Sequence, residues 1–207
     1  MPTTMKLINR IKQLLRRPET QPLPVYQRIP LAQIPTASTI LFYGGNKITE
    51  LFGNRIYKHP YHPPAFHAAF YISDDTMLNV GKFKTLKTLS EEFASTRRVD
   101  VITYDISDKR RAAIARAALK DITHPRVGIQ LPDYSFTDYL RFGVKIFKPS
   151  KKDFCSENVV ELFEGEGVKV SDLEPYNTAP WDLQEFAEEN QPFCRLFTVH
   201  LGPDFPD

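Results

Sequence analysis

Two residues of this chain combine a reactive side chain with a sequence context that suits it. Cys155 lies in the run Lys-Lys-Asp-Phe-Cys-Ser-Glu-Asn-Val-Val at residues 151–160, which predicts a helix that begins at or next to the cysteine. The positive end of a helix dipole favours the thiolate, the nucleophilic form of cysteine. His67 lies upstream in the apolar run of residues 65–72, which predicts a strand. A histidine that faces this thiol can act as its base, so the pair indicates nucleophilic catalysis.

The expected helix of Cys155 has residues at both ends that suit a start and a stop. Asp153 or Ser156 is expected to cap the start, and Gly165 or Gly167 is expected to end the helix. The apolar stripe between these ends consists of Val159, Val160 and Phe163. Such a stripe predicts that one face of the helix packs on the body of the protein.

The strand of His67 is expected to form a hairpin with residues 76–80, because Asp74-Asp75 is a turn signal. Folding the chain at this turn places Asn79 opposite His67 or diagonal to it. Cross-strand neighbours lie ~4.5–5.5 Å apart at Cβ, so Asn79 can bond one imidazole nitrogen and aim the other at Cys155. Alternation along the strand predicts one face made of Phe66, Ala68 and Phe70, and another made of His67, Ala69 and Tyr71.

A set of Cys, His and Asn is the catalytic set of papain-like enzymes, and longer runs extend the likeness. The run His-Ala-Ala-Phe-Tyr-Ile-Ser-Asp-Asp at residues 67–75 resembles the histidine strand and turn of the circularly permuted papain-like hydrolases in the NlpC-type superfamily. The run Phe-Cys-Ser-Glu-Asn-Val-Val at residues 154–160 resembles their nucleophile helix, and residues 177–183 resemble the segment beyond it. In this branch, which includes YiiX-like proteins and lecithin retinol acyltransferase, the histidine precedes the cysteine, as it does here. The likeness spans about residues 36–200.

The resemblance implies an α+β fold in which an antiparallel sheet packs against helices and Cys155 stands at a helix N-terminus. It also implies acyl transfer, in which Cys155 attacks the carbonyl of an amide or ester and His67 moves the proton. Asn79 would orient His67, although this branch commonly has Glu or His at that position. The backbone N–H of Cys155 and a side chain, for which we choose Tyr43, would stabilise the oxyanion. No cofactor is implied.

The resemblance leaves three functions open. A peptidase or amidase that acts on a peptide or a peptidoglycan stem is favoured, because that is the commonest chemistry of the superfamily. A lipid acyl hydrolase or acyltransferase is the alternative within the same fold. The third alternative is a non-catalytic binding or structural subunit of a larger assembly.

Other residues whose side chains could bind a metal or react have simpler interpretations. His59, His62 and His67 have a spacing that can bind zinc. However, three prolines stiffen this loop and His67 belongs to a strand, so no metal site is expected. Cys194, in a strand-like run after Pro192, is expected to be a packing residue.

The chain is expected to consist of residues 1–35, an amphipathic helix and a proline-rich linker, and residues 36–207, the catalytic domain. Residues 5–17 have helical spacing and only basic charges, which fits docking on the domain itself, on a partner or on an anionic membrane surface. The other patterns predict strands at residues 39–43, 99–104 and 194–201, and helices at residues 47–57, 90–94, 109–122 and 135–147. This order lacks regular βαβ alternation, which indicates an α+β fold.

The composition argues against several other classes of protein. A hydrophobic fraction of 42% with 25% charged residues is typical of a globular protein rather than a disordered one. The net charge of +2 gives no general reason to expect nucleic acid. Two cysteines are too few for a disulfide scaffold, and no apolar run approaches the ~18 residues of a membrane span. Basic residues interrupt the N-terminus where a signal peptide has its apolar core, so the expected location is the cytoplasm, with a virion component as the alternative.

Overall fold

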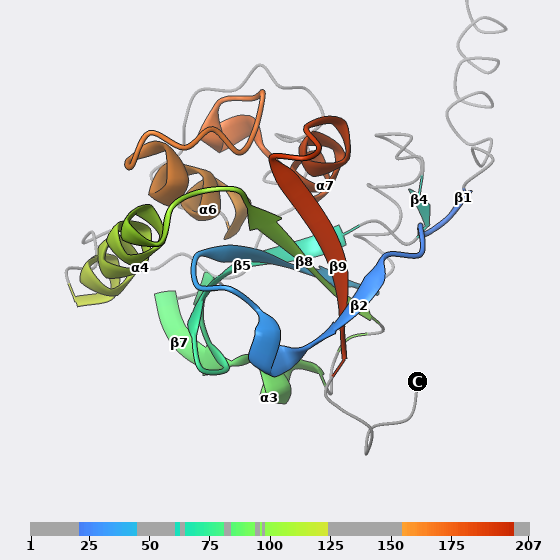
Figure 1. Ribbon diagram of the computed structural model, residues 1–207, viewed down its shortest axis with the longest axis horizontal. Helices are drawn as coiled ribbons and strands as arrows, with labels where there is room; N and C mark the ends of the chain where they lie inside the picture. The colour runs from blue at the N-terminus through green and yellow to red at the C-terminus, as the bar shows by residue number, and fades with distance from the viewer. Residues whose placement is uncertain are drawn as a thin grey trace, which may run out of the picture.

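A seven-stranded sheet forms the centre of the protein (Figure 1). The computed structural model describes residues 21–44, 61–62, 65–80, 84–93, 96, 98–123 and 155–200. In spatial order the strands are β2 (Gln27–Pro30), β9 (Cys194–His200), β8 (Arg98–Tyr104), β3 (Ser38–Tyr43), β5 (Ala65–Ser73), β6 (Thr76–Val80) and β7 (Lys84–Thr88). Neighbouring strands are antiparallel, except that β2 runs parallel to β9. Two short strands, β1 (Gln21–Pro22) and β4 (Tyr61–His62), form a separate parallel pair.

Helices pack against this sheet, which confirms the α+β class. The helices of the described residues are α3 (Leu89–Phe93), α4 (Asp108–Thr123), α6 (Cys155–Glu164) and α7 (Pro180–Glu189), with 3-10 turns η1 (Leu31–Gln33) and η3 (Pro175–Asn177). None of the helices in these ranges is long and apolar enough to cross a membrane.

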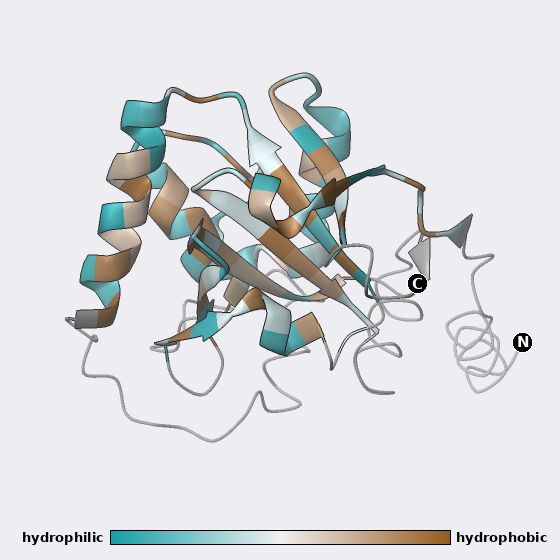
Figure 2. Ribbon diagram, turned by 60° about the horizontal axis from the view of Figure 1, so that its bottom comes forward, coloured by the Kyte–Doolittle hydropathy of each residue, from teal (hydrophilic) through white to brown (hydrophobic). Residues whose placement is uncertain are grey.

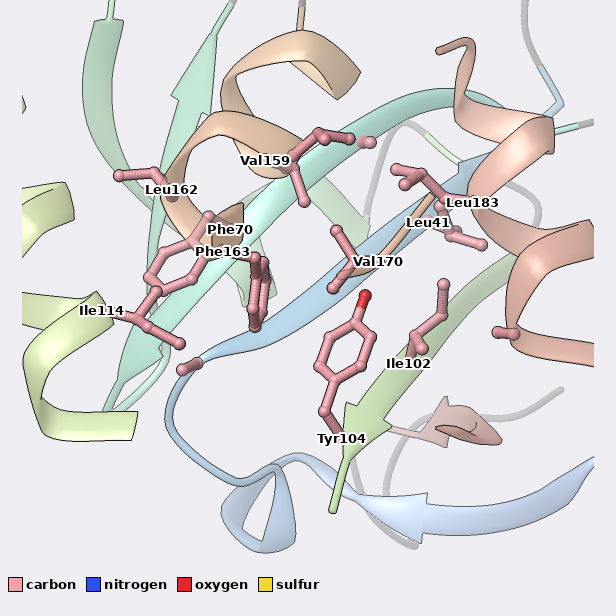
Figure 3. Close-up of a cluster of buried hydrophobic side chains, with 14 of the residues drawn as sticks. Leu41, Phe70, Ile102, Tyr104, Ile114, Val159, Leu162, Phe163, Val170 and Leu183 are labelled. Carbon is pink, nitrogen blue, oxygen red and sulfur yellow. The ribbon is translucent and has the colours of Figure 1, made fainter. Parts of the chain in front are cut away.

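The sheet buries a core on each of its faces, because successive side chains of a strand point to opposite sides. On one face, α4, α6 and α7 pack against residues such as Leu41 and Phe70 (Figure 3). On the other face, α3 and the segment 29–34 pack against Ile40 and Met77. Figure 2 shows that hydrophobic residues are concentrated on the strands in the middle of the molecule.

Phe163 packs α6 against the sheet. Its ring is fully buried, with its centre 4.5 Å from that of Tyr104 and 5.7 Å from that of Phe70. Both are spacings at which aromatic pairs attract beyond the burial of area alone. Val159 and Val160 are buried beside it, so the apolar stripe expected from the sequence faces the core.

The end of α6 follows the glycine signal in the sequence. Gly167 adopts a φ of +71°, a conformation that costs glycine nothing. The N–H of Val168 donates to the carbonyl of Phe163 at 2.9 Å, which satisfies one of the last helical carbonyls. This end fixes the helix at the side opposite to Cys155.

The hairpin of β5 and β6 turns at Asp74 and Asp75, as expected. Their φ angles of 48° and 63° are both left-handed, as a two-residue hairpin turn of type I′ requires. The Asp75 carboxylate also accepts a hydrogen bond from the N–H of Ser90 at 3.0 Å. The turn therefore closes the hairpin, with Ser73 opposite Thr76, and fixes the start of α3. An extra residue of β5, Ile72, then shifts the pairing by one residue, so that Tyr71 lies opposite Met77.

The sequence patterns do not indicate several of the observed elements, among them β2, β7 and α7. Within the expected linker, β2 pairs with β9 and buries Ile29, so part of this segment belongs to the sheet. At the other edge lies β7, whose residues are mostly exposed and carry no apolar alternation. In α7, Pro180 occupies the first turn and Asp182 accepts from the N–H of Ala179 at 2.8 Å. The helices expected at residues 5–17, 47–57 and 135–147 lie outside the described residues.

Candidate active site

His67 lies near the start of β5, beside an irregularity in the pairing with β3. Ala65 lies opposite Tyr43 and His67 opposite Phe42, so Phe66 is an extra residue in β5. The ring centres of His67 and Phe42 are 5.5 Å apart, and Phe66 packs in the same cluster as Phe42. Phe66 therefore shares the side of His67, which corrects the strict alternation expected from the sequence. Such a bulge twists the strand and redirects nearby side chains. The bulge at Phe66 lies next to His67, so it affects the direction in which the imidazole points.

Asn79 meets His67 across the hairpin. The register pairs Tyr71 with Met77, and continuing it places Asn79 opposite Ala69, diagonal to His67. Nε2 of His67 lies 2.6 Å from Oδ1 of Asn79. An amide oxygen only accepts hydrogen bonds, so Nε2–H of His67 is the donor. This bond fixes the plane of the ring and leaves Nδ1 for a second partner.

Cys155 is that second partner, joined to the imidazole by a hydrogen bond and by charge. Burial by itself lowers the pKa of His67, because it disfavours a charged ring. The charge of Cys155, the hydrogen bonds to Cys155 and Asn79, and the charge of Glu92 act in the opposite sense, and the pKa of His67 lies above its usual value. The imidazolium thus persists to a higher pH than that of an ordinary histidine, and its positive charge favours the thiolate form of a neighbouring cysteine.

Cys155 is the first residue of α6, and 5% of it is exposed. The backbone N–H groups of a first helical turn have no acceptor within the helix, and the positive end of the dipole lies there. Both features stabilise negative charge on the sulfur or on an oxygen bound next to it. The first turn of α6 and the positive charge of His67 thus both favour a thiolate at Cys155.

A buried polar cluster holds the first turn of α6 in place. Ser156 Oγ donates to the carbonyl of Thr178 at 2.5 Å, and Thr178 Oγ1 lies 2.9 Å from Ser171 Oγ. All three residues are buried. Ser156 therefore does not cap its own helix, because its hydroxyl is committed to the segment before α7. The other cap considered, Asp153, lies outside the described residues.

The structure does not bring the Tyr43 hydroxyl to this pair. The hydroxyl donates to Oε1 of Gln184 on α7 at 3.2 Å, and Arg98 lies over the ring, 5.6 Å from its centre. Burial and then the charge of Asp100 raise the pKa of Tyr43 well above its usual value. Tyr43 thus belongs to a polar network between the sheet and α7, which corrects its expected role as an oxyanion donor.

Cys194 provides an internal contrast to Cys155. It is fully buried at the start of β9, in the core that also contains α6, and the two thiols are not joined in a disulfide. Burial raises the pKa of Cys194 to about 12, so it stays a neutral thiol at physiological pH. Its expected role as a packing residue is confirmed.

No group of three or more His, Cys, Asp or Glu residues in the described part of the chain is placed to hold a metal ion. Of the three histidines considered for zinc, His59 and the side chain of His62 lie outside that part. The third, His67, is engaged with Asn79 and Cys155.

A hollow of about 830 Å³ lies at the far end of α6 from the cysteine. It is bounded by Ile106 and Arg110 at the start of α4, by residues 166–169, and by Phe186 and Phe193. A helix of ten residues is ~15 Å long, so this hollow is remote from Cys155. The candidate site is therefore identified by the contacts of His67, and the hollow has no part in it.

Two contributors to the site have no clear signal in the sequence. Thr178 anchors the first turn of α6 from a position 22 residues further along the chain. Glu92 acts on His67 from α3. Of these, only Thr178 falls in a quoted likeness, the run at residues 177–183, and neither can be assigned a partner without knowledge of the tertiary fold.

Comparison of the sequence with protein-family models gave no match, and comparison with curated proteins gave no relative.

Proposed function

We propose that this protein is a cysteine hydrolase that cleaves an amide or ester bond through a thioester on Cys155. The observation that carries the proposal is the simultaneous engagement of His67 with Asn79 on one side and Cys155 on the other. His67 and Asn79 come from the two strands of one hairpin, β5 and β6, and Cys155 comes from α6, far along the chain. Cys155 contacts His67, and His67 contacts Asn79, which is the order of a nucleophile, a base and an orienting group.

The reaction begins with the Cys155 thiolate and the His67 imidazolium. The sulfur forms a bond to the carbonyl carbon, and the carbonyl π electrons move to the oxygen, where N–H donors of the first turn of α6 stabilise the charge. Collapse of this intermediate breaks the bond to the amine or alcohol, which leaves with the proton of His67. Water, deprotonated by His67, then attacks the thioester and releases the acid and the thiolate.

For the fold we propose the permuted papain-like arrangement of the NlpC-type superfamily. The support is the chain order, with a histidine strand and its hairpin partner before a nucleophile helix, and the antiparallel sheet packed against that helix. By this likeness an amide is the favoured substrate, as in a peptide or a peptidoglycan stem. A lipid ester is the alternative substrate of the same site.

A non-catalytic structural role for the same three residues is the second candidate. The observation in its favour is the burial of Cys155, which limits the access of a substrate. The two candidates differ in one measurable property, because a structural cysteine has no need of a reactive thiolate.

Alkylation of the native protein separates these candidates. With iodoacetamide at about pH 6.5, where an ordinary thiol of pKa ~8.5 is mostly protonated, we expect modification of Cys155 to exceed that of glutathione. Cys194, whose pKa burial raises to about 12, is expected to stay unmodified until the protein is denatured. Peptide mapping by mass spectrometry reports both sites in one sample. Equal protection of the two cysteines would exclude the hydrolase and favour the structural role.

A further inference from the structure

Ser156, the residue after the nucleophile, forms a hydrogen bond to a carbonyl outside its own helix. Its Oγ donates to the carbonyl of Thr178, 22 residues further along the chain, at 2.5 Å. We propose that Ser156 is a positioning residue for the oxyanion: this bond holds the first turn of α6 in the orientation in which its N–H groups reach the charged oxygen of the acylation intermediate. The inference rests on the proposed function, because it concerns the first step of the same reaction.

The hydrogen of the Ser156 hydroxyl is committed to this one bond. A serine at or near the start of a helix usually accepts a hydrogen bond from a nearby N–H of that helix. A hydroxyl has a single hydrogen, and that of Ser156 is donated to Thr178. Both residues are fully buried, so bulk water does not compete for the bond. The bond therefore ties the first turn of α6 to a separate segment of the chain.

The acceptor belongs to a peptide group that is fixed at both ends. The carbonyl of Thr178 and the N–H of Ala179 lie in one planar peptide group. The N–H of Ala179 donates to Oδ2 of Asp182, in the first turn of α7, at 2.8 Å. The N–H of Thr178 donates to the carbonyl of Pro175 in η3 at 3.1 Å. The direction of the carbonyl that receives Ser156 is therefore set by its neighbours in η3 and α7.

The side chain of Thr178 adds a third restraint on this acceptor. Its Oγ1 donates to a backbone carbonyl, that of Glu174 at 3.1 Å or that of Leu173 at 3.4 Å, which uses its single hydrogen. Ser171 Oγ, 2.9 Å from Thr178 Oγ1, is then the donor of the bond between the two hydroxyls. Ser171 Oγ also accepts from the N–H of Leu173 at 3.0 Å. The anchor of α6 is thus a connected chain of hydrogen bonds.

Attack on a carbonyl needs this precise orientation more than the formation of the thiolate does. Donors stabilise an oxyanion when they lie ~2.7–3.1 Å from the oxygen, and hydrogen bonds weaken steeply as they bend. The charge of His67 acts on the thiolate over a longer range, since the energy of two charges falls only as the inverse of their distance. A small rotation of the first turn therefore disturbs the oxyanion before it disturbs the thiolate. Loss of the Ser156 bond should separate two reactions of the same sulfur.

Two reagents distinguish these effects in Ser156→Ala. With p-nitrophenyl acetate, Sγ of Cys155 bonds to the carbonyl carbon, the oxygen takes the negative charge, and the intermediate collapses to the thioester as nitrophenolate leaves. With iodoacetamide, Sγ displaces iodide at a saturated carbon, and no oxyanion forms. We expect acylation to slow by about ten-fold, less than the ~10²–10³-fold of losing a donor outright. Alkylation should proceed near the wild-type rate, because the thiolate persists.

Ser38→Ala is the matched control. Ser38 is another fully buried serine, and its Oγ donates to a backbone carbonyl, that of Pro35, at 2.7 Å. This bond lies within residues 35–38, at the start of β3, so the substitution removes the same kind of bond at a place that does not anchor α6. Both rates should equal those of wild type. Cys194, which stays protected in the native protein, shows in the same peptide maps that each variant is folded.

Thr178→Val tests the same bond from its acceptor side, and it decides alone if Ser156→Ala does not fold. It keeps the Ser156 hydroxyl and removes the hydroxyl that restrains Thr178, so acylation should slow by a smaller factor while alkylation stays near wild type. The inference is overturned if acylation and alkylation slow together in these variants, or if acylation matches wild type in both. An unreactive Cys155 in the wild-type protein would instead refute the proposed function, and the inference with it.

Discussion

Replacing His67 by alanine is expected to slow acylation of Cys155 by about 10²–10⁴-fold, the contribution of a positioned acid–base group. The physical reason is that His67 holds the thiolate by charge and by a hydrogen bond, and both are lost with the ring. The measurement is the burst of nitrophenolate when the protein is mixed with p-nitrophenyl acetate. The mass of the protein then shows whether one acetyl group has been added at Cys155.

His200→Ala is the matched control, because His200 is another strand histidine, on β9, with no described contact to Cys155. It should acylate at the wild-type rate. Asn79→Ala should retain more activity than His67→Ala, since it removes the orienting bond of 2.6 Å and keeps the base. Equal burst rates in His67→Ala and wild type would show that the histidine does not serve this thiol.

Arg98→Met is expected to cost about 3 kcal/mol of unfolding free energy at pH 7, at the low end for breaking a buried ion pair, because Arg98 is partly exposed. Arg98 Nε donates to Oδ1 of Asp100 at 2.8 Å, and Asp100 is fully buried. Burial raises the pKa of Asp100, and Arg98 opposes that rise. Without Arg98, the pKa of Asp100 rises further, so the ionised carboxylate becomes a larger penalty at neutral pH.

The sign of the pH dependence follows from this raised pKa. Both states bind the Asp100 proton below its unfolded pKa of ~3.9, so the deficit of Arg98→Met should shrink as the pH falls toward 4 and grow as it rises toward 7. Urea unfolding at these two pH values measures it. The control Arg195→Met, at an exposed position of β9, should change stability by less than about 0.5 kcal/mol. A deficit that is the same at both pH values would show that the cost comes from packing on Tyr26 and Tyr43 rather than from charge.

The contacts that follow from local rules could be predicted from the sequence. The Asp74-Asp75 turn predicts the hairpin of β5 and β6 and so brings Asn79 near His67, although the one-residue shift at Ile72 that sets the final register has no signal in the sequence. In the same way, the apolar stripe of α6 and Gly167 fix the extent of the helix and the face that it buries. These features depend on spacings of a few residues, for which backbone geometry leaves few choices.

The role of Tyr43 could not be predicted, because its partner Gln184 lies 141 residues away on a helix that the patterns did not indicate. A tyrosine on this strand is a reasonable candidate for a hydroxyl near the site. Its position is decided by Gln184 and Asp100, which contact it only in the folded protein. The bulge at Phe66 could not be predicted either, because nothing in an apolar run marks which residue is extra in the pairing. The sequence does not predict strand β7, because this mostly exposed edge strand carries no apolar alternation.

Titration of His67 by NMR, in the wild-type protein and in Cys155→Ala, tests the central claim most directly. The account predicts that the pKa of His67 falls when Cys155 is removed, because the charge and the hydrogen bond that raise it disappear while burial continues to lower it. Cys194→Ala, which removes the other buried thiol, should leave the titration of His67 unchanged. A His67 that titrates identically in wild type and in Cys155→Ala would contradict the pairing on which the proposed function depends.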